Sequence, residues 1–207
     1  MTDIPSKRLI IAQIVLIFVL PVFLLYFNVV PDSWRLFFLS AGSLAIYGII
    51  RHESWTHEEM GLRHDNIRRA LPLYLGFTIL AIIALYLLDE RVDPVNLSDK
   101  VSQAYLFRTL ILFLPISFFQ EFAFRSFLIP RLKLIFNHNL TIVLVNTLLF
   151  TMIHVIYPSL IIGLPLAFVG GIFFTWLYLK YPNLLLISLA HAATNIVAIL
   201  LGFFTIH

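Results

Sequence analysis

Residues 104–128 have the sequence AYLFRTLILFLPISFFQEFAFRSFL, which is apolar over most of its length. A helix needs about 20 apolar residues to cross a hydrocarbon core about 30 Å thick, so this run is long enough to span a membrane. It also contains Glu121 and Arg125. A charge at the bilayer centre costs about 2.5–3.5 kcal/mol on insertion scales, and such residues usually face a protein interior or a watery cavity and mark function. The stretch therefore predicts a membrane helix that contributes to a polar site.

The rest of the chain has the same character. Of its 207 residues, 60% are hydrophobic and only 12% are charged, with a mean hydropathy of +0.95. These values lie far outside the composition of soluble proteins and predict an all-α, polytopic transmembrane helix bundle. No polar stretch is long enough for a second soluble domain, so we expect a single integral membrane domain over residues 1–207. The chain has no cysteine, which excludes disulfides, thiolate catalysis and thiolate metal sites.

About seven apolar runs are candidates for membrane spans. They are residues 9–30, 36–50, 71–88, 104–128, 140–156, 160–179 and 184–204. The intervening loops then place more basic residues on one side of the membrane than on the other. The richer side has Lys7, Arg8, Arg51, Arg63, Arg68, Arg69, Arg131, Lys133 and Lys180, and the poorer side has Arg35, Arg91, Lys100 and Arg108. The positive-inside rule therefore predicts a cytoplasmic N-terminus and, for seven spans, a C-terminus outside.

Residues 51–69 form the one long basic loop of the predicted bundle. Thr56 and Glu59 have the spacing of a capping box, which predicts a short helix lying on the cytoplasmic surface. We expect this loop to be a topology anchor attracted to anionic lipid, with substrate docking as the alternative. The sequence pI of 9.3 follows from such membrane-facing basic residues, and we expect no nucleic-acid partner.

Polar side chains lie inside three of the predicted spans. Glu121 and Arg125 are four residues apart in the fourth span, His154 lies in the fifth, and His191 and Asn195 are four apart in the seventh. Residues four apart share a helix face, and Glu121 can pair with Arg125 at that spacing. A salt bridge that merely holds the bundle together is the simpler explanation for this pair. The two histidines and the amide favour a shared functional site in which the three helices converge.

In their order along the chain, these residues resemble the motifs of the CAAX protease and bacteriocin-processing (CPBP, or Abi) family of intramembrane endopeptidases. The family pattern is Glu-Glu-x-x-x-Arg, then Phe-x-x-x-His, then His-x-x-x-Asn or Asp, each in its own helix. The chain has Gln120-Glu121-x-x-x-Arg125, Phe150-x-x-x-His154 and His191-x-x-x-Asn195. The resemblance covers about residues 104–204 and, more faintly, residues 61–63.

The resemblance implies an intramembrane endopeptidase that hydrolyses a peptide bond near the membrane by an activated water. It implies a peptide or protein substrate at the lipid bilayer and no cofactor. The multi-pass chain is expected in the cytoplasmic membrane of a bacterium, or in the endoplasmic reticulum if it is eukaryotic. The implied roles are water activation for Gln120 with His154, oxyanion stabilisation for His191 with Asn195, and support for Glu121 with Arg125.

Gln120 departs from the family pattern, which has a glutamate at this position. Glutamine can orient a water molecule but cannot accept its proton. On an α-helix Gln120 and Glu121 are about 100° apart, so if Gln120 faces His154, Glu121 faces elsewhere, towards Arg125. Three accounts stay open: an atypical enzyme with His154 or Glu121 as the base, a natural pseudoprotease, or a glutamine introduced to trap substrate.

Two further alternatives concern the chemistry and the class of protein. His154, His191 and Glu121 are acceptable zinc ligands, so zinc is the alternative to a metal-free mechanism. A noncatalytic immunity or regulatory protein that binds peptides in the same cavity is the alternative to an enzyme. A proton-coupled carrier would need paired repeats with broken helices, and the sequence shows no clear internal repeat.

Overall fold

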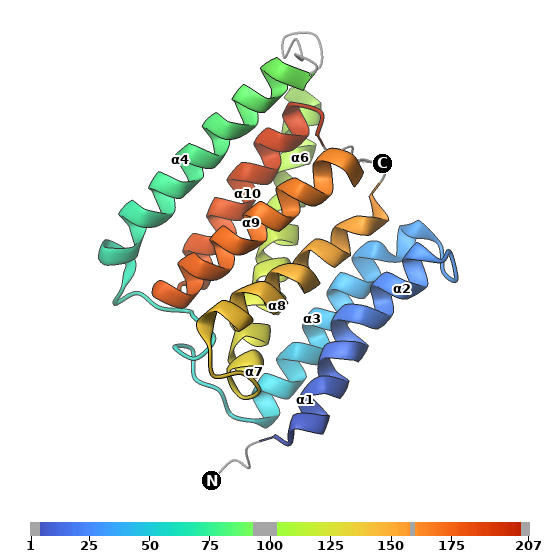
Figure 1. Cartoon of the computed structure of the whole chain (residues 1–207), viewed down its shortest axis with the longest axis vertical. Coiled ribbons are helices and arrows are strands. Elements are labelled where there is room, and N and C mark those ends of the chain that lie inside the picture. Colours follow the sequence, from blue (N-terminus) through green and yellow to red (C-terminus); the bar gives the residue numbers. More distant parts are fainter. Residues whose placement is uncertain (1–4, 93–102, 158–159, 204–207) are drawn as a thin grey trace.

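The computed structural model describes residues 5–92, 103–157 and 160–203, and within these ranges it is helical without a β-strand (Figure 1). The all-α prediction is confirmed. In chain order the elements are α1 (Lys7–Ile14), a π-helix (Val15–Val19), α2 (Leu20–Tyr26), a 3-10 turn (Asp32–Trp34), α3 (Arg35–His52), α4 (Ile67–Val92), α6 (Gln103–Glu121), a second π-helix (Phe122–Leu128), α7 (Ile129–Lys133), α8 (Asn139–Met152), a 3-10 turn (Ile153–Ile156), α9 (Leu160–Lys180) and α10 (Leu184–Leu200).

Six helical stretches of the described chain are long and apolar enough to cross a membrane. They are Lys7–Tyr26, Asp32–His52, Ile67–Asp89, Thr109–Lys133, Asn139–Ile156 and Leu160–Lys180. The seventh predicted span corresponds to α10, an apolar helix of only 17 residues. At 1.5 Å per residue it is about 26 Å long, slightly less than the hydrocarbon core. Residue 204, the end of the last predicted run, lies outside the described residues.

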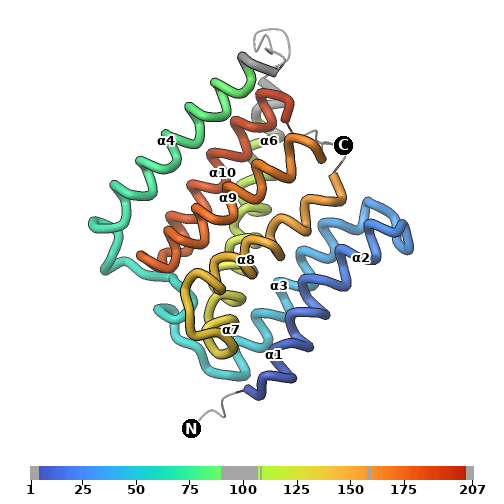
Figure 2. Tube along the Cα trace, viewed as in Figure 1, coloured from blue at the N-terminus to red at the C-terminus, as the bar shows by residue number. Residues whose placement is uncertain are grey.

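The helices are arranged around α6 and α10 (Figure 2). α10 packs against α6 and α4, and the π-helix Phe122–Leu128 that follows α6 packs against both α8 and α10, so the segments that carry the predicted motifs are neighbours. α1, α2 and α3 form one flank of the bundle, and α4 forms the opposite flank (Figure 1). Many of the remaining apolar side chains face outward, for example Leu44 and Ile161, as expected for a surface in contact with lipid.

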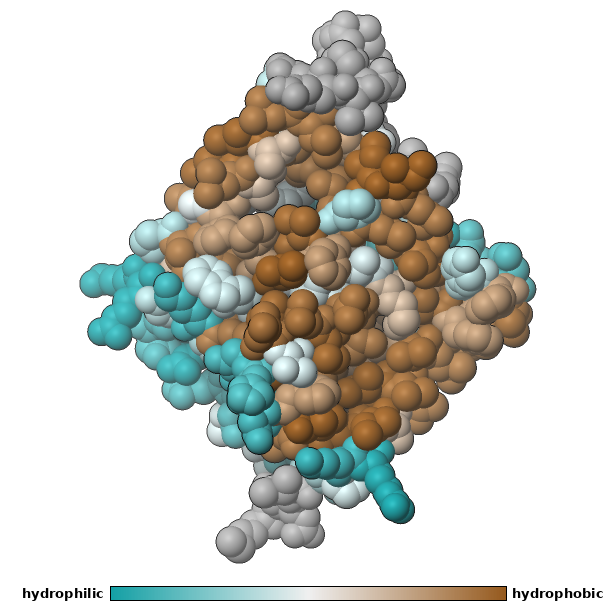
Figure 3. Space-filling view, viewed as in Figure 1, coloured by the Kyte–Doolittle hydropathy of each residue, from teal (hydrophilic) through white to brown (hydrophobic). Residues whose placement is uncertain are grey.

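The basic side predicted from the loops forms one end of the bundle. The start of α1, the α3–α4 loop, α7 and the α9–α10 turn lie together at the lower left of Figure 1. Hydrophilic side chains gather at this end in Figure 3, whereas the middle of the same face is hydrophobic. Among the basic residues on this side, Arg131 differs from the prediction because its side chain is only 1% exposed. Lys100, counted on the opposite side, lies outside the described residues.

The α3–α4 loop contains the predicted capping box but not the predicted helix. The Thr56 amide donates to Glu59 Oε2 at 2.7 Å, and the Glu59 amide donates to Thr56 Oγ1 at 3.2 Å. The chain then makes a single turn and reaches Gly61 in the left-handed region, with φ of 74°. The Gly61 carbonyl accepts a hydrogen bond of 2.8 Å from the Leu184 amide at the start of α10. The loop is therefore bound to the start of α10 at Gly61 and does not continue as a helix.

Candidate active site

Glu121 and Arg125 form a buried ion pair at a change of helical geometry. Glu121 is the last residue of α6, and Arg125 lies in the π-helix that continues it. Arg125 Nη1 donates to Glu121 Oε1 at 3.2 Å, and Nε lies 3.2 Å from Oε2 without the alignment of a hydrogen bond. Both side chains are fully buried. The ion pair predicted from the sequence is present. We expected a regular α-helix throughout this segment, but the chain changes to a π-helix after Glu121.

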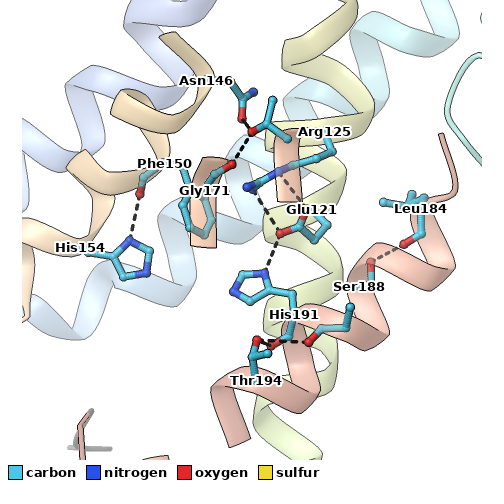
Figure 4. Close-up of polar contacts among 12 residues, drawn as sticks. Glu121, Arg125, Asn146, Phe150, His154, Gly171, Leu184, Ser188, His191 and Thr194 are labelled. Carbon is cyan, nitrogen blue, oxygen red and sulfur yellow. Dashed lines mark hydrogen bonds and ion pairs between the residues drawn. The ribbon is translucent and has the colours of Figure 1, made fainter. Parts of the chain in front are cut away.

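The same carboxylate also binds His191 from α10. His191 Nδ1 lies 2.7 Å from Glu121 Oε1, and the imidazole is only 2% exposed (Figure 4). A carboxylate can only accept, so Nδ1 carries the hydrogen, and in the neutral ring Nε2 is the acceptor. Glu121 therefore holds one tautomer of His191 while it neutralises Arg125. We had expected His191 to act with Asn195, and Glu121 with Arg125 to support the site.

His154 has a similarly defined ring orientation. It lies in the 3-10 turn after α8, and its Nδ1 is 2.9 Å from the Phe150 carbonyl oxygen. Because a carbonyl only accepts, Nδ1 again carries the hydrogen and Nε2 is the acceptor of the neutral ring. Figure 4 shows the two imidazoles on different helical segments, and the partners of their Nδ1 atoms assign the same tautomer to both.

The Phe150 ring lies between these polar groups. Its centroid is 5.0 Å from that of His154 and 5.6 Å from that of His191. The Arg125 guanidinium carbon lies 4.3 Å from the same ring, within the range of a cation–π interaction. The motif phenylalanine therefore brings both histidines and the arginine around one aromatic side chain. The predicted convergence of the fourth, fifth and seventh spans is present in this arrangement.

Gln120 faces a different part of the bundle from Glu121. It lines a cavity of about 140 Å³ between the α1–α3 flank and α6, together with Ile153, Ile156 and Tyr157, which surround His154 in the chain. Its side chain is buried, and Oε1 has no hydrogen-bond partner. A buried acceptor without a hydrogen bond lowers the stability of the protein. A water molecule or ligand that donates to Gln120 Oε1 would therefore be favoured there. The different directions of Gln120 and Glu121 match the angular argument from the sequence.

Asn195 lies one turn beyond His191 on α10 and is half-buried. Within the part of the chain that the structure describes, its side chain makes no hydrogen bond. The polar contacts of this turn come instead from Thr194, whose hydroxyl lies 2.9 Å from the His191 carbonyl oxygen. The role of Asn195 in stabilising the oxyanion stays a prediction.

The sequence interpretation missed two buried polar residues next to the site. Asn146 Nδ2 donates to the Phe124 carbonyl at 2.6 Å, and Thr175 Oγ1 lies 2.9 Å from Asn146 Oδ1. Both side chains are fully buried. Asn146 is four residues before Phe150, so the periodicity that identified His154 also points to it. It was overlooked because it belongs to no motif of the resemblance.

The α3–α4 loop, at the basic end of the bundle, contacts the π-helix Phe122–Leu128. Ser126 Oγ donates to the Met60 carbonyl at 2.6 Å, and the Tyr178 hydroxyl lies 3.4 Å from the same oxygen. A Cβ on Gly61 would overlap that hydroxyl, so the loop approaches closely because this residue is glycine. The loop is thus part of the support of the site, in addition to the membrane anchoring that we predicted.

A zinc site does not assemble from these residues. Among residues 5–92, 103–157 and 160–203, no group of three or more His, Asp and Glu side chains is placed to hold a metal ion. Glu121 and His191 are adjacent, but Glu121 is already paired with the Arg125 cation. Zinc held by Glu121, His154 and His191 stays an alternative prediction.

Comparison with known families agrees with the predicted resemblance. The family model described as type II CAAX prenyl endopeptidase Rce1-like matches residues 102–197. This segment contains all six predicted site residues, from Gln120 to Asn195, and the match confirms the predicted relation to the CPBP family. Neither a curated protein nor a solved structure matches the chain.

Proposed function

Because residues 102–197 match the family model described as type II CAAX prenyl endopeptidase Rce1-like, we propose that this chain hydrolyses a peptide bond near the membrane surface by an activated water. The observation that carries the proposal is the 2.7 Å contact between His191 Nδ1 and a fully buried Glu121 that is also paired with Arg125. A carboxylate that fixes an imidazole tautomer and stabilises its protonated form is a recurrent device of hydrolytic sites.

We assign the proton acceptor for water to His154. Glu121 is fully buried and already bound to Arg125 and His191, so it is poorly placed to take a proton from water. The His154 ring has its Nδ1–H directed at the Phe150 carbonyl, which makes Nε2 the basic nitrogen. Peptide hydrolysis needs such a base at the attacking water, and the same group then returns the proton to the leaving amine.

We assign stabilisation of the oxyanion to His191 with Asn195. When the ring is protonated, with Nδ1–H held by the Glu121 carboxylate, Nε2 can donate a hydrogen bond to the negative charge that develops on the scissile carbonyl. Gln120 cannot accept a proton, and its unpaired Oε1 is suited to orienting the water or a substrate N–H group. Gln120 therefore serves here in positioning, where the family has a glutamate.

One observation favours a second function. The amide of Gln120 occupies the position of the family's first motif glutamate and lines a largely apolar cavity, where it has no capacity for proton transfer. A catalytically weakened homologue would keep peptide binding in that cavity and act as an immunity or regulatory membrane protein. Both functions place a peptide or protein partner at the bilayer.

Cleavage of membrane-anchored peptides by the purified chain in liposomes separates these functions. The peptides include prenylated and unmodified C-terminal segments, and the variants are Gln120→Glu and His154→Ala, singly and combined, with and without chelator. The matched control is His138→Ala, because His138 is an exposed histidine outside the site. We expect cleavage by the unaltered chain and by the control, and loss with His154→Ala.

Cleavage only by Gln120→Glu would show instead that the unaltered chain is a weakened homologue or a form in which the glutamine traps substrate. Absence of cleavage by every form, Gln120→Glu included, would overturn the proposed activity. Loss of cleavage on addition of chelator would show that the mechanism needs a metal ion.

A further inference from the structure

The π-helix Phe122–Leu128 follows Glu121 directly and contains Arg125, and one of its carbonyls accepts a hydrogen bond from a neighbouring helix. π-Helical turns are rare and are frequent at functional sites because they alter the normal backbone ladder. Here the Phe124 carbonyl accepts a hydrogen bond of 2.6 Å from Asn146 Nδ2 on α8. Both residues are buried, so this oxygen has protein and not water as its partner. Asn146 thus satisfies a carbonyl of the π-helix from outside it.

The second half of the Asn146 amide is fixed by α9. Thr175 Oγ1 lies 2.9 Å from Asn146 Oδ1 and 2.6 Å from the Gly171 carbonyl of its own helix. The Thr175 hydroxyl has one hydrogen for Asn146 Oδ1 or the Gly171 carbonyl and can also accept, whereas the Phe124 carbonyl can only accept and so requires the Nδ2 donor on its side. The amide can therefore adopt one orientation only, with Oδ1 towards Thr175 and Nδ2 towards Phe124.

Close approach of α8 and α9 makes this contact possible. A Cβ on Gly171 would lie 3.1 Å from Thr147 Cγ2 and 3.3 Å from the Phe150 ring. A larger residue than glycine would therefore push α9 away from α8 at the level of Thr175. The packing and the hydrogen bonds depend on each other.

The link to the site is covalent. The Phe124 carbonyl belongs to the peptide group that joins Phe124 to Arg125, so Asn146 fixes the orientation of the backbone from which the Arg125 side chain departs. Arg125 in turn binds the carboxylate that holds His191. We propose that Asn146 and Thr175 are positioning residues, which set the π-helix so that Arg125 and Glu121 present His191 in a single tautomer.

Part of this proposal rests on the proposed function, because it predicts an effect on catalysis, and part does not. The independent readout is the ¹⁵N NMR signal of His191 in the full chain in liposomes, assigned by its loss in His191→Phe. In the unaltered chain we expect a hydrogen-bonded Nδ1–H signal. Asn146→Leu and Thr175→Val should weaken or shift it, whereas Thr175→Ser should retain it.

Thr147→Val is the matched control. Thr147 is a fully buried threonine on α8 next to Asn146, and its hydroxyl has no hydrogen-bond partner. Valine keeps its shape, so the variant tests the loss of a buried hydroxyl without loss of the network. We expect an unchanged His191 signal with Thr147→Val and a changed one with Thr175→Val.

Asn146→Asp adds a test by pH. A residue that only fills space would give no pH response. An ionised carboxylate accepts from Thr175 but cannot donate to the Phe124 carbonyl, whereas the protonated carboxyl can do both. The His191 signal and the cleavage rate of this variant, relative to the unaltered chain, should therefore recover as the pH falls. In kinetic terms, kcat should fall about 10- to 100-fold in the ionised variant, with KM within twofold, as expected for misplacement of a group that does not touch substrate.

The outcomes are distinct. An unchanged His191 signal in folded Asn146→Leu and Thr175→Val would overturn the positioning role. If Asn146→Leu does not fold, the pH response of Asn146→Asp decides, and a response parallel to that of the unaltered chain would overturn the role. If the unaltered chain cleaves no peptide, the proposed function fails, but the NMR comparison still tests the network.

Discussion

Two buried arginines lie six residues apart in the chain, and each forms an ion pair with a glutamate. Arg125 is fully buried, pairs with Glu121 and lies over the Phe150 ring at 4.3 Å. Arg131 is 1% exposed, pairs with Glu53 at 2.7 Å and lies 4.9 Å from the ring of Phe127. The chemistry of the two pairs is the same, with a guanidinium, a carboxylate and an aromatic face.

The two carboxylates differ in their second partner. Glu53 is 17% exposed and accepts a hydrogen bond of 2.9 Å from the Trp55 indole, which cannot change its protonation state. Glu121 is fully buried and binds His191, which can. A buried Arg–Glu pair therefore indicates a structural link in one case and a candidate proton-handling site in the other. The second partner of the carboxylate, Trp55 in one pair and His191 in the other, makes this difference.

The sharpest test of this distinction is to remove the third group from the Glu121 pair. His191→Phe keeps an aromatic ring but has no nitrogen to bind Glu121 or to donate to an oxyanion. We expect the cleavage rate to fall about 10²- to 10³-fold, the usual cost of removing one oxyanion donor. Peptide cleavage in liposomes measures it. A rate within threefold of the unaltered chain would mean that Glu121–Arg125 is structural, like the second pair.

The next largest effect is expected from breaking the Glu121 pair itself. Arg125→Met leaves a buried carboxylate without its cation, and breaking a buried ion pair costs about 3–5 kcal/mol. The free energy of unfolding in detergent micelles measures this cost. Arg125→Met combined with Glu121→Gln removes both charges and should recover most of the stability while cleavage stays low. No recovery in the double variant would contradict the assigned pairing.

Arg131→Met breaks the Arg131–Glu53 pair and should lower the stability of the protein without lowering its activity. A hydrogen bond to a charged group contributes about 1.5–3 kcal/mol, and we expect a loss in this range because Glu53 is partly exposed and can be solvated. The unfolding free energy checks the loss. Cleavage per folded molecule should stay within twofold of the unaltered chain, and a selective fall in kcat would show that this end of the bundle also acts on the site.

A smaller loss is expected from the loop that carries Glu53. Gly61→Ala places a side chain at a φ of 74° and against the Tyr178 hydroxyl, with an expected cost of about 1–3 kcal/mol for the strained backbone. Tyr178→Phe removes the overlapping oxygen, so the double variant should be less destabilised than the sum of the single variants. Additive losses in unfolding experiments would show that the backbone strain alone is responsible.

The smallest effect is expected at an exposed pair in the same loop. Arg63 binds both oxygens of Asp65, at 2.6 and 3.0 Å, and these hydrogen bonds lower the pKa of the Asp65 carboxyl below its ordinary value. The pair therefore stabilises the loop above that ordinary pKa, and the contribution is lost as pH falls through the lowered one. Asp65→Asn should change stability little, and less in high salt, because the pair is solvent-screened. A large, salt-independent loss in thermal unfolding would contradict this.

The spans and the ion pair were predictable because their signals are local. Apolar runs of about 20 residues identify membrane helices from length and composition alone. The Glu121–Arg125 pair follows from a spacing of four residues on one helix. The opposed directions of Gln120 and Glu121 follow from the same helical geometry.

The contacts that make a site of this pair were not predictable, because they join distant parts of the chain. His191 is 70 residues from Glu121, and no local pattern assigns it to that carboxylate instead of to Asn195. The capping box predicted a helix at Thr56, but the distant contact of Gly61 with Leu184 ends the turn. The π-helix likewise depends on Asn146, 22 residues from Phe124.

The spacing of the Glu121–Arg125 pair has a consequence for biogenesis. Glu121 is synthesised 70 residues before His191, so α6 reaches the membrane before α10 is available to bind its carboxylate. A lone charge at that depth would oppose insertion. Arg125, four residues away on the same helical segment, neutralises it without help from the rest of the chain. The arginine thus lets the segment partition into lipid as a self-contained unit, and the imidazole joins a carboxylate that is already in place.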